Sequence, residues 1–169
     1  MAAKKITTPR TPVAATAKTY RAETVAGYLL MQQTGSVKVT STQLQALLYA
    51  AQGYTLARYN RRLFSDPIES WEESPTVAAV ALRYGVYGEE ALPKPESFNK
   101  HVLDSEARGT LDEVWALHAH NYQYRKPVDA KAWRESNPPW NNAPRGTVIS
   151  TEEIKAYFAG VLGGPRRSR

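Results

Sequence analysis

Thr40 and Gln43 have the spacing of a helix capping box, and this feature constrains the fold more than any other in the chain. In a capping box the Thr hydroxyl accepts a hydrogen bond from the third helical amide, and the Gln side chain returns to the amide of the cap. An apolar stripe follows at helical spacing, namely Leu44, Leu47, Leu48, Ala51 and Thr55. The pattern predicts an amphipathic helix over residues 41–59 with this stripe turned inward. Gly53 costs about 1 kcal/mol there relative to Ala, which indicates close packing.

Two more helices are expected on either side of an extended segment. The first covers residues 22–33 and ends at Gly35. Residues 63–71 lack a 3.6-residue period and carry a proline between short apolar pairs, so they are expected to be extended around a turn. Ser74 and Pro75 have the character of an N-cap and a first-turn proline, which predicts a helix from there to Gly85.

Three helices are expected in the second half, after a loop over residues 86–103. A long one covers residues 105–121, and a shorter one opens at Pro127 and is stopped by the prolines of segment 137–140. Ser150 and Glu153 repeat the capping-box spacing before the last helix. The expected fold is mainly α, a single compact domain of about six helices with a short extended or hairpin segment near residues 62–72.

The positive charge of the chain is concentrated at its two ends. The net charge is +6, but residues 1–21 contribute +5 and residues 163–169 contribute +3. The stretch between them holds 14 basic and 16 acidic side chains, a net charge of −2. We therefore expect a flexible basic arm over residues 1–20, a helical domain over 21–162 and a basic tail over 163–169. Nucleic acid is not the expected partner of the folded body, because a phosphate-binding surface needs excess Lys and Arg on ordered elements.

The residue types that support catalysis are scarce or badly spaced. The chain has no cysteine, which excludes disulfides, thiolate nucleophiles and zinc sites built on sulfur. His118 and His120 are two residues apart on a helix, so they cannot converge on one metal ion. The carboxylates at positions 69, 72 and 73 surround Trp71 beside a turn and are interpreted as solvated acids. We expect no enzymatic activity, no cofactor and no metal.

The hydropathy pattern predicts a cytoplasmic protein without a membrane partner. The longest apolar runs, such as Thr76 to Leu82, fall far short of the roughly 20 residues that a bilayer span requires. The first residues lack the apolar stretch of a secretory signal.

Several short motifs then follow one another in a recognisable order. They are the Leu-Gln-Ala-Leu-Leu-Tyr run from Leu44, Leu63-Phe64, the Pro-Ile-Glu-Ser-Trp run from Pro67, the Leu-Asp-Glu-Val-Trp run from Leu111, Pro139-Trp140, and the segment from Ile149 to Phe158. Their order and spacing over residues 22–162 resembles the Panacea domain of bacterial and phage antitoxins, the SocA-like family. The sequence departs from that family's pattern at residues 73–76, where Glu-Ser-Pro-Thr replaces Tyr-Gly-Pro-Val, and it lacks the Thr-His dipeptide that often precedes the Pro-Trp turn.

The resemblance implies an antitoxin that neutralises a cognate growth- or translation-inhibiting toxin enzyme by direct protein binding. Alarmone-synthetase-like enzymes are among the toxins that such domains accompany. Steric occlusion of the toxin active site is the expected route, because a rigid helical face loses less entropy on binding than an unfolded arm. Two alternatives remain open: a proteolytic adaptor that delivers the toxin to a protease, and a nucleic-acid-binding regulator that uses the basic tails.

Aromatic and arginine side chains outside the apolar stripes are the candidates for the partner-binding surface, since both residue types anchor protein interfaces. The three arginines after residue 57 are also placed to cap the carbonyls of the preceding helix. The candidates are Tyr54, Arg58, Tyr59, Arg61, Arg62, Trp71, Tyr84, Tyr87, Trp133 and Trp140.

Overall fold

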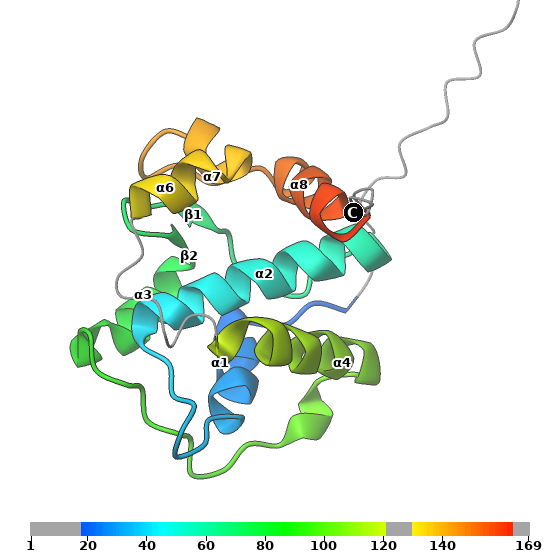
Figure 1. Ribbon diagram of the computed structural model, residues 1–169. Helices are drawn as coiled ribbons and strands as arrows, with labels where there is room; N and C mark the ends of the chain where they lie inside the picture. The colour runs from blue at the N-terminus through cyan, green and yellow to red at the C-terminus, as the bar shows by residue number, and fades with distance from the viewer. Residues whose placement is uncertain (1–17, 121–129, 164–169) are drawn as a thin grey trace, which may run out of the picture.

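The computed structural model describes residues 18–120 and 130–163, and within them the fold is mainly α with one two-stranded antiparallel sheet (Figure 1). The α-helices are α1 (Ala22–Met31), α2 (Ser41–Tyr59), α3 (Ala78–Tyr84), α4 (Ser105–Val114), α6 (Ala130–Glu135), α7 (Pro138–Asn142) and α8 (Thr151–Gly163). The strands are β1 (Glu69–Ser70) and β2 (Pro75–Thr76), and the short helical turns are η1 (Gly85–Tyr87), η2 (Lys100–Val102) and η3 (Trp115–Ala119). The expected fold class, with its hairpin near residues 62–72, is confirmed.

Helix α2 is the central element: α1, α3, α4 and α8 pack around it, α7 packs on α8, and α6 packs on α7 (Figure 1). The capping box predicted from Thr40 and Gln43 is present in full, and the helix has the predicted bounds. Every residue from Leu44 to Leu56 is buried. The expectation of an amphipathic helix with one inward stripe is therefore wrong, because α1, α3, α4 and α8 contact α2 from several sides.

Three buried glutamines bind loop backbone with their side-chain amides. Gln52 accepts from the amides of Leu63 and Phe64 and donates to the carbonyl of Phe64. Gln45 makes the same reciprocal pair with the backbone of Val77, at 2.9 and 3.2 Å. The Gln33 side chain accepts from the amide of Val39 and donates to the carbonyl of Leu92. Each side-chain amide makes the hydrogen bonds that a neighbouring strand would otherwise make. The buried backbone groups that it contacts are therefore paired.

The hairpin of β1 and β2 pairs Glu69 with Thr76 and Ser70 with Pro75. A third extended segment runs beside β1, since the Ser70 amide donates to the Thr147 carbonyl at 2.8 Å. The prediction that Ser74 and Pro75 begin a helix is wrong: Pro75 lies in β2 and α3 begins at Ala78. The amide of Val77 is held by Gln45 of α2, which keeps this segment extended up to the start of the helix.

Helix α4 begins at the N-cap Asp104, whose carboxylate accepts from the Ala107 amide at 2.8 Å. The single long helix expected here is interrupted, because residues Trp115–Ala119 form a π-helical turn. Such turns occur mostly as short insertions in α-helices and are frequent at functional sites. Residue 121 and the helix start expected at Pro127 lie outside the described residues.

The C-terminal part contains a helix that the sequence reasoning missed. The two prolines do end α6, as predicted, but they also occupy the first positions of α7. Proline is well tolerated there, since the first-turn amides of a helix have no intrahelical partner. The Ser150 hydroxyl accepts from the Glu153 amide at 3.3 Å before α8, so half of the predicted capping box is present. The hydroxyl itself donates to the carboxylate of Glu152.

The expected flexible arm does not extend to residue 20. Tyr20 is buried and forms a parallel bridge with Phe64, and its amide donates to the Leu63 carbonyl at 2.9 Å. Its phenol donates to Asp104 at 2.8 Å. Residues 1–17 and 164–169 lie outside the described residues, whereas Gly163, assigned to the tail from the sequence, belongs to α8.

Candidate protein-binding surface

Four of the ten candidate residues are not exposed. Tyr54, Arg61, Tyr84 and Trp140 are buried, which corrects the expectation that they stand apart from the core. Each is covered by other segments of the chain, a property that helical spacing alone does not reveal. The remaining candidates reach the surface at least in part: Arg58, Tyr59, Arg62, Trp71, Tyr87 and Trp133.

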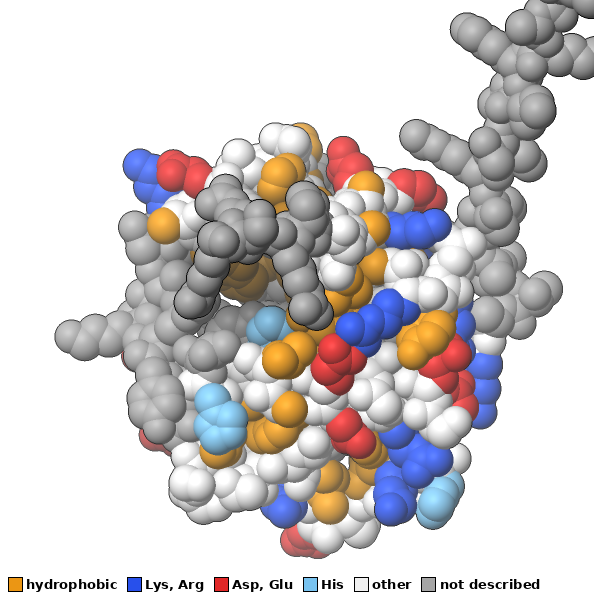
Figure 2. Space-filling view, turned by 45° about the vertical axis from the view of Figure 1, so that its right-hand side comes forward, with side chains coloured by type: hydrophobic (Ala, Val, Ile, Leu, Met, Phe, Trp, Pro, Cys, Tyr) orange, Lys and Arg blue, Asp and Glu red, His pale blue; other side chains and the backbone are white. Residues whose placement is uncertain are grey.

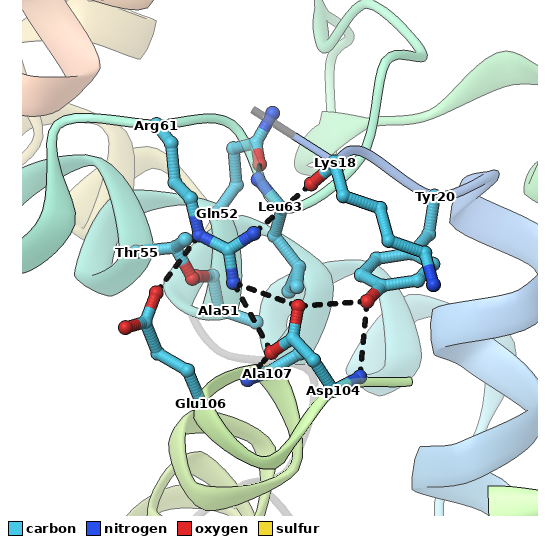
Figure 3. A network of polar contacts seen from close by, with 10 residues as sticks. All are labelled: Lys18, Tyr20, Ala51, Gln52, Thr55, Arg61, Leu63, Asp104, Glu106 and Ala107. Atoms are coloured by element: carbon cyan, nitrogen blue, oxygen red, sulfur yellow. Dashed lines mark hydrogen bonds and ion pairs between the residues drawn. The ribbon is translucent and has the colours of Figure 1, made fainter. Parts of the chain in front are cut away.

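Arg61 holds the fold together at the C-terminal end of α2. Its guanidinium donates to Glu106 at 2.9 Å, to both oxygens of Asp104 at 3.2 and 3.3 Å, and to the Lys18 carbonyl at 3.0 Å (Figure 3). Burial raises the pKa of Asp104, but the Ala107 amide, the Tyr20 phenol and Arg61 outweigh this effect and bring the pKa below its usual value. All three guanidinium nitrogens of Arg61 donate to groups of the protein, so Arg61 has a structural role.

A second polar cluster lies where α2 faces α4 and η3. The phenol of Tyr54 is 2.7 Å from Nε2 of His118, and the guanidinium of Arg58 stacks on the Tyr54 ring at 5.3 Å. Arg58 also forms a two-point ion pair with Glu113, whose pKa it lowers by hydrogen bonding. Burial raises the pKa of Tyr54. The polar groups of Arg58 and Tyr54 therefore contact other residues of the protein.

The three tryptophan candidates come together around the hairpin. The indole nitrogen of Trp140 in α7 donates to the carbonyl of Trp71 at 2.9 Å. Trp133 in α6 packs edge-on against Trp140, with ring centroids 4.8 Å apart. Trp140 is fully buried and Trp133 is half-buried, while Trp71 is 39% exposed. Buried Trp140 thus contacts both the backbone of exposed Trp71 and the ring of half-buried Trp133.

Arg134 borders these tryptophans, and Arg145 and Glu72 lie close enough to Arg134 to affect its pKa. Arg134 stacks on the Trp140 ring at 5.0 Å and donates to the Ser70 hydroxyl at 3.2 Å. Arg145 lies 3.6 Å from Glu72, and its side chain is 52% exposed. Burial and the charge of Arg145 lower the pKa of Arg134, whereas Glu72 acts in the opposite direction. We call Trp71, Trp133, Arg134 and Arg145, with Trp140 beneath them, the tryptophan surface.

Sequence reasoning missed Arg134 and Arg145 as neighbours of the tryptophans. The position of Arg134 beside Trp133 was the only local signal. Arg145 reaches the cluster because the segment after α7 turns back along β1, where the Gly146 amide donates to the Ser70 carbonyl at 2.7 Å. That return is a tertiary contact between residues far apart in the chain.

A second surface, on α3 and η1, was also missed. Val77, Val80 and Tyr84 form the buried inward stripe of this segment, and the opposite face carries Leu82 and Val86, which are 88% and 85% exposed. Ala79 and Tyr87 flank them and are exposed as well. We call Ala79, Leu82, Val86 and Tyr87 the α3 patch. The spacing of its members, opposite the inward stripe, was the signal that could have identified it.

Potential ligands of a metal ion do not cluster in the part of the chain that the structure describes. Nowhere in residues 18–120 and 130–163 do three His, Cys, Asp or Glu side chains group so as to hold a metal ion. A cavity of about 450 Å³ is lined by Gln33, Thr34, Gly35, Lys38, Ala91, Leu92, Pro93 and Lys94.

Acidic, basic and hydrophobic side chains alternate over the face drawn in Figure 2. Within the described part of the chain, no helix combines the length and hydrophobicity of a membrane span.

Comparison of the chain with models of protein families, with curated proteins and with solved structures finds no match.

Proposed function

We propose that the protein is a cytoplasmic antitoxin that neutralises a toxin enzyme by binding it through the tryptophan surface, without catalysing a reaction itself. The order of short motifs that resembles the Panacea domain supports the antitoxin role. The choice of binding surface rests on the hydrogen bond that the indole of buried Trp140 donates to the carbonyl of exposed Trp71.

The composition of the tryptophan surface fits the centre of a protein interface. Trp and Arg are the residue types most enriched among those that dominate binding energy. Trp71 and Trp133 provide large rings, and Arg145 provides a half-exposed guanidinium that pairs with Glu72, the residue after Trp71.

The rigidity of this surface favours tight binding. Trp140 and Arg134 hold the Trp71 carbonyl and the Ser70 hydroxyl from α7 and α6. These bonds hold the backbone of the hairpin, and the Trp133 ring packs against Trp140, so this part of the surface loses less conformational entropy when a complex forms. A rigid, compact surface of this kind suits steric occlusion of a toxin active site better than a long flexible tether does.

The test is co-expression with the reading frame adjacent to this gene. Expression of the neighbouring product alone is expected to stop growth, and co-expression is expected to restore it and to yield a complex that co-purifies. The same rescue in a strain lacking the major cytoplasmic proteases would support occlusion. If rescue disappears in that strain, the protein is a proteolytic adaptor and occlusion is wrong.

Truncation separates the antitoxin from a nucleic-acid-binding regulator. A protein lacking residues 1–17 and 164–169 loses the whole net charge of +6 but retains the whole described fold. It is expected to rescue growth as the full chain does. Loss of rescue together with loss of salt-sensitive DNA binding would instead indicate the regulator. A neighbouring product that is harmless, or that fails to bind, would refute the antitoxin proposal.

A further inference from the structure

The cavity of about 450 Å³ lies between the segment that follows α1 and the segment that leads to η2. Its volume falls within the range of roughly 300–1,000 Å³ that is usual for ligand pockets. The two segments run side by side, since the Leu92 amide donates to the Val39 carbonyl at 2.8 Å (Figure 1). The side chain of buried Gln33 bonds to the backbone of both residues. Hydrogen bonds within the chain therefore fix the two walls before any ligand binds.

The charged side chains that line this cavity are two lysines, Lys38 and Lys94. Among the described residues, no Asp or Glu lies within ion-pair distance of either amine. The nearest acids along the chain, Glu90 and Glu96, are exposed and do not belong to the lining. The described lining thus carries two positive charges and no negative charge, which favours an anionic ligand.

Lys94 is held at the cavity by the main chain. Its Nζ donates to the carbonyl of Gln33 at 3.3 Å, just beyond the C-terminal end of α1. A positive charge is favourable at that end of a helix. An ammonium group has further protons to donate after one hydrogen bond. Lys94 can therefore interact with the end of α1 and with an anion at the same time.

Two lysines without acidic partners match the charge of a phosphate monoester, which is about −1.5 to −2 at neutral pH. A carboxylate carries a single charge and is neutralised by one of them. The cavity also has room for an organic group beside the phosphate, because about 450 Å³ is many times the roughly 30 Å³ of a water molecule. The uncharged part of the lining, which includes Thr34, Ala91 and Pro93, provides a wall for that group. We propose that this cavity binds a small organic phosphate monoester.

Titrations of the full chain followed by NMR test the proposal, with phenyl phosphate, benzoate and inorganic phosphate as the probes. Phenyl phosphate is expected to give saturable shifts of backbone amides within residues 33–38 and 91–94. It should bind more tightly than benzoate, which has the same ring but a single charge, and more tightly than inorganic phosphate, which has no ring. Benzoate that binds as tightly would overturn the phosphate assignment. The absence of saturable shifts in these two segments at millimolar phenyl phosphate would overturn the site itself.

Substitution of the lysines tests their part in binding. Lys38→Gln and Lys94→Gln should each weaken the binding of phenyl phosphate about tenfold, since each removes a charge-assisted hydrogen bond but retains a side chain of similar length. Lys100→Gln is the matched control, because Lys100 is exposed in η2 and does not line the cavity. Its affinity should equal that of the wild-type chain. Equal losses in all three variants would indicate a general attraction to positive charge and would overturn the proposal.

A negative charge placed in the lining tests the site without removing a lysine. Gly35 lines the cavity, and a β-carbon added there meets no atom within 4 Å, so Gly35→Asp should fold normally and lose the binding of phenyl phosphate. Gly85→Asp is the control, since Gly85 is equally open but lies outside the lining. Binding that survives Gly35→Asp would contradict the proposal. The experiments use only this chain, so their failure does not affect the antitoxin proposal, which depends on the neighbouring gene product.

Discussion

The ring of Phe158 in α8 lies directly against the backbone of Gly53 in α2, where a β-carbon would overlap the ring. Tyr49 and Tyr54 of α2 flank Phe158 on either side, with ring centroids 5.1 and 5.7 Å away. The close packing expected from a glycine in the middle of this helix is confirmed. The contact fixes how near the two helices approach.

Gly53→Ala should therefore destabilise the protein even though Ala is the better helix former. Overpacking costs about 1–3 kcal/mol and exceeds the gain of up to about 1 kcal/mol in helix propensity. We expect the free energy of unfolding in urea to fall by about 1–2 kcal/mol. Gly160→Ala in α8 is the matched control, because nothing lies within 4 Å of its added β-carbon. The control should be neutral or stabilising, and equal losses in both variants would contradict the packing argument.

Gln52→Met should be among the most damaging single substitutions in α2. It retains the length of the side chain but leaves two amides and a carbonyl of residues 63–64 buried without a partner. We expect a loss of about 3 kcal/mol in unfolding free energy, measured by chemical denaturation.

Gln32→Met provides the contrast. The side-chain nitrogen of Gln32 is already buried without a hydrogen-bond partner in the described structure, so its removal should change stability by less than about 0.5 kcal/mol. A comparable loss at both positions would mean that the amide of Gln52 has no special role.

Acid should weaken the contact between the N-terminal segment and α4. The pKa of Asp104 is lower in the folded protein than in the unfolded chain, so its contribution to stability is complete above the unfolded value of about 3.9 and is lost as the pH falls through the folded value. Asp104→Asn should reduce stability at neutral pH and make the decline in acid shallower. Because Asn still caps a helix, Asp104→Ala should be less stable again. Thermal melts across the acid range measure both effects.

Trp71→Ala should weaken the toxin complex without unfolding the protein. Trp71 is 39% exposed, and its contact with Trp140 is made by its backbone, which the substitution retains. A central interface tryptophan contributes about 2 kcal/mol or more, so calorimetry should show binding about 30-fold weaker or worse.

Tyr59→Ala is the matched control for that measurement. Tyr59 is 42% exposed at the C-terminal end of α2, outside the tryptophan surface. It should change the affinity by less than about threefold. If Tyr59→Ala weakens binding and Trp71→Ala does not, the toxin binds at the end of α2 instead.

Elements whose ends depend on local chemistry could be predicted from the residues alone. Both ends of α2 and its full capping box were predicted correctly, since a cap joins residues three positions apart. Tertiary contact overrode the local signal at Ser74 and Pro75, where Gln45 holds the next residue in an extended conformation. No pattern within residues 74–76 carries information about a side chain of α2.

Exposure was decided only by the tertiary structure. Trp140 and Trp71 look alike in the sequence, yet one is fully buried and the other is 39% exposed. The aromatic and arginine composition predicted a binding surface, but not which of the candidate residues lie close together. Burial depends on which distant elements cover a side chain, and the tryptophan surface forms where α6, α7 and the segment after α7 meet the hairpin. Spacing along one helix describes only that helix's own faces, so neither the burial of Trp140 nor the position of Arg145 follows from it.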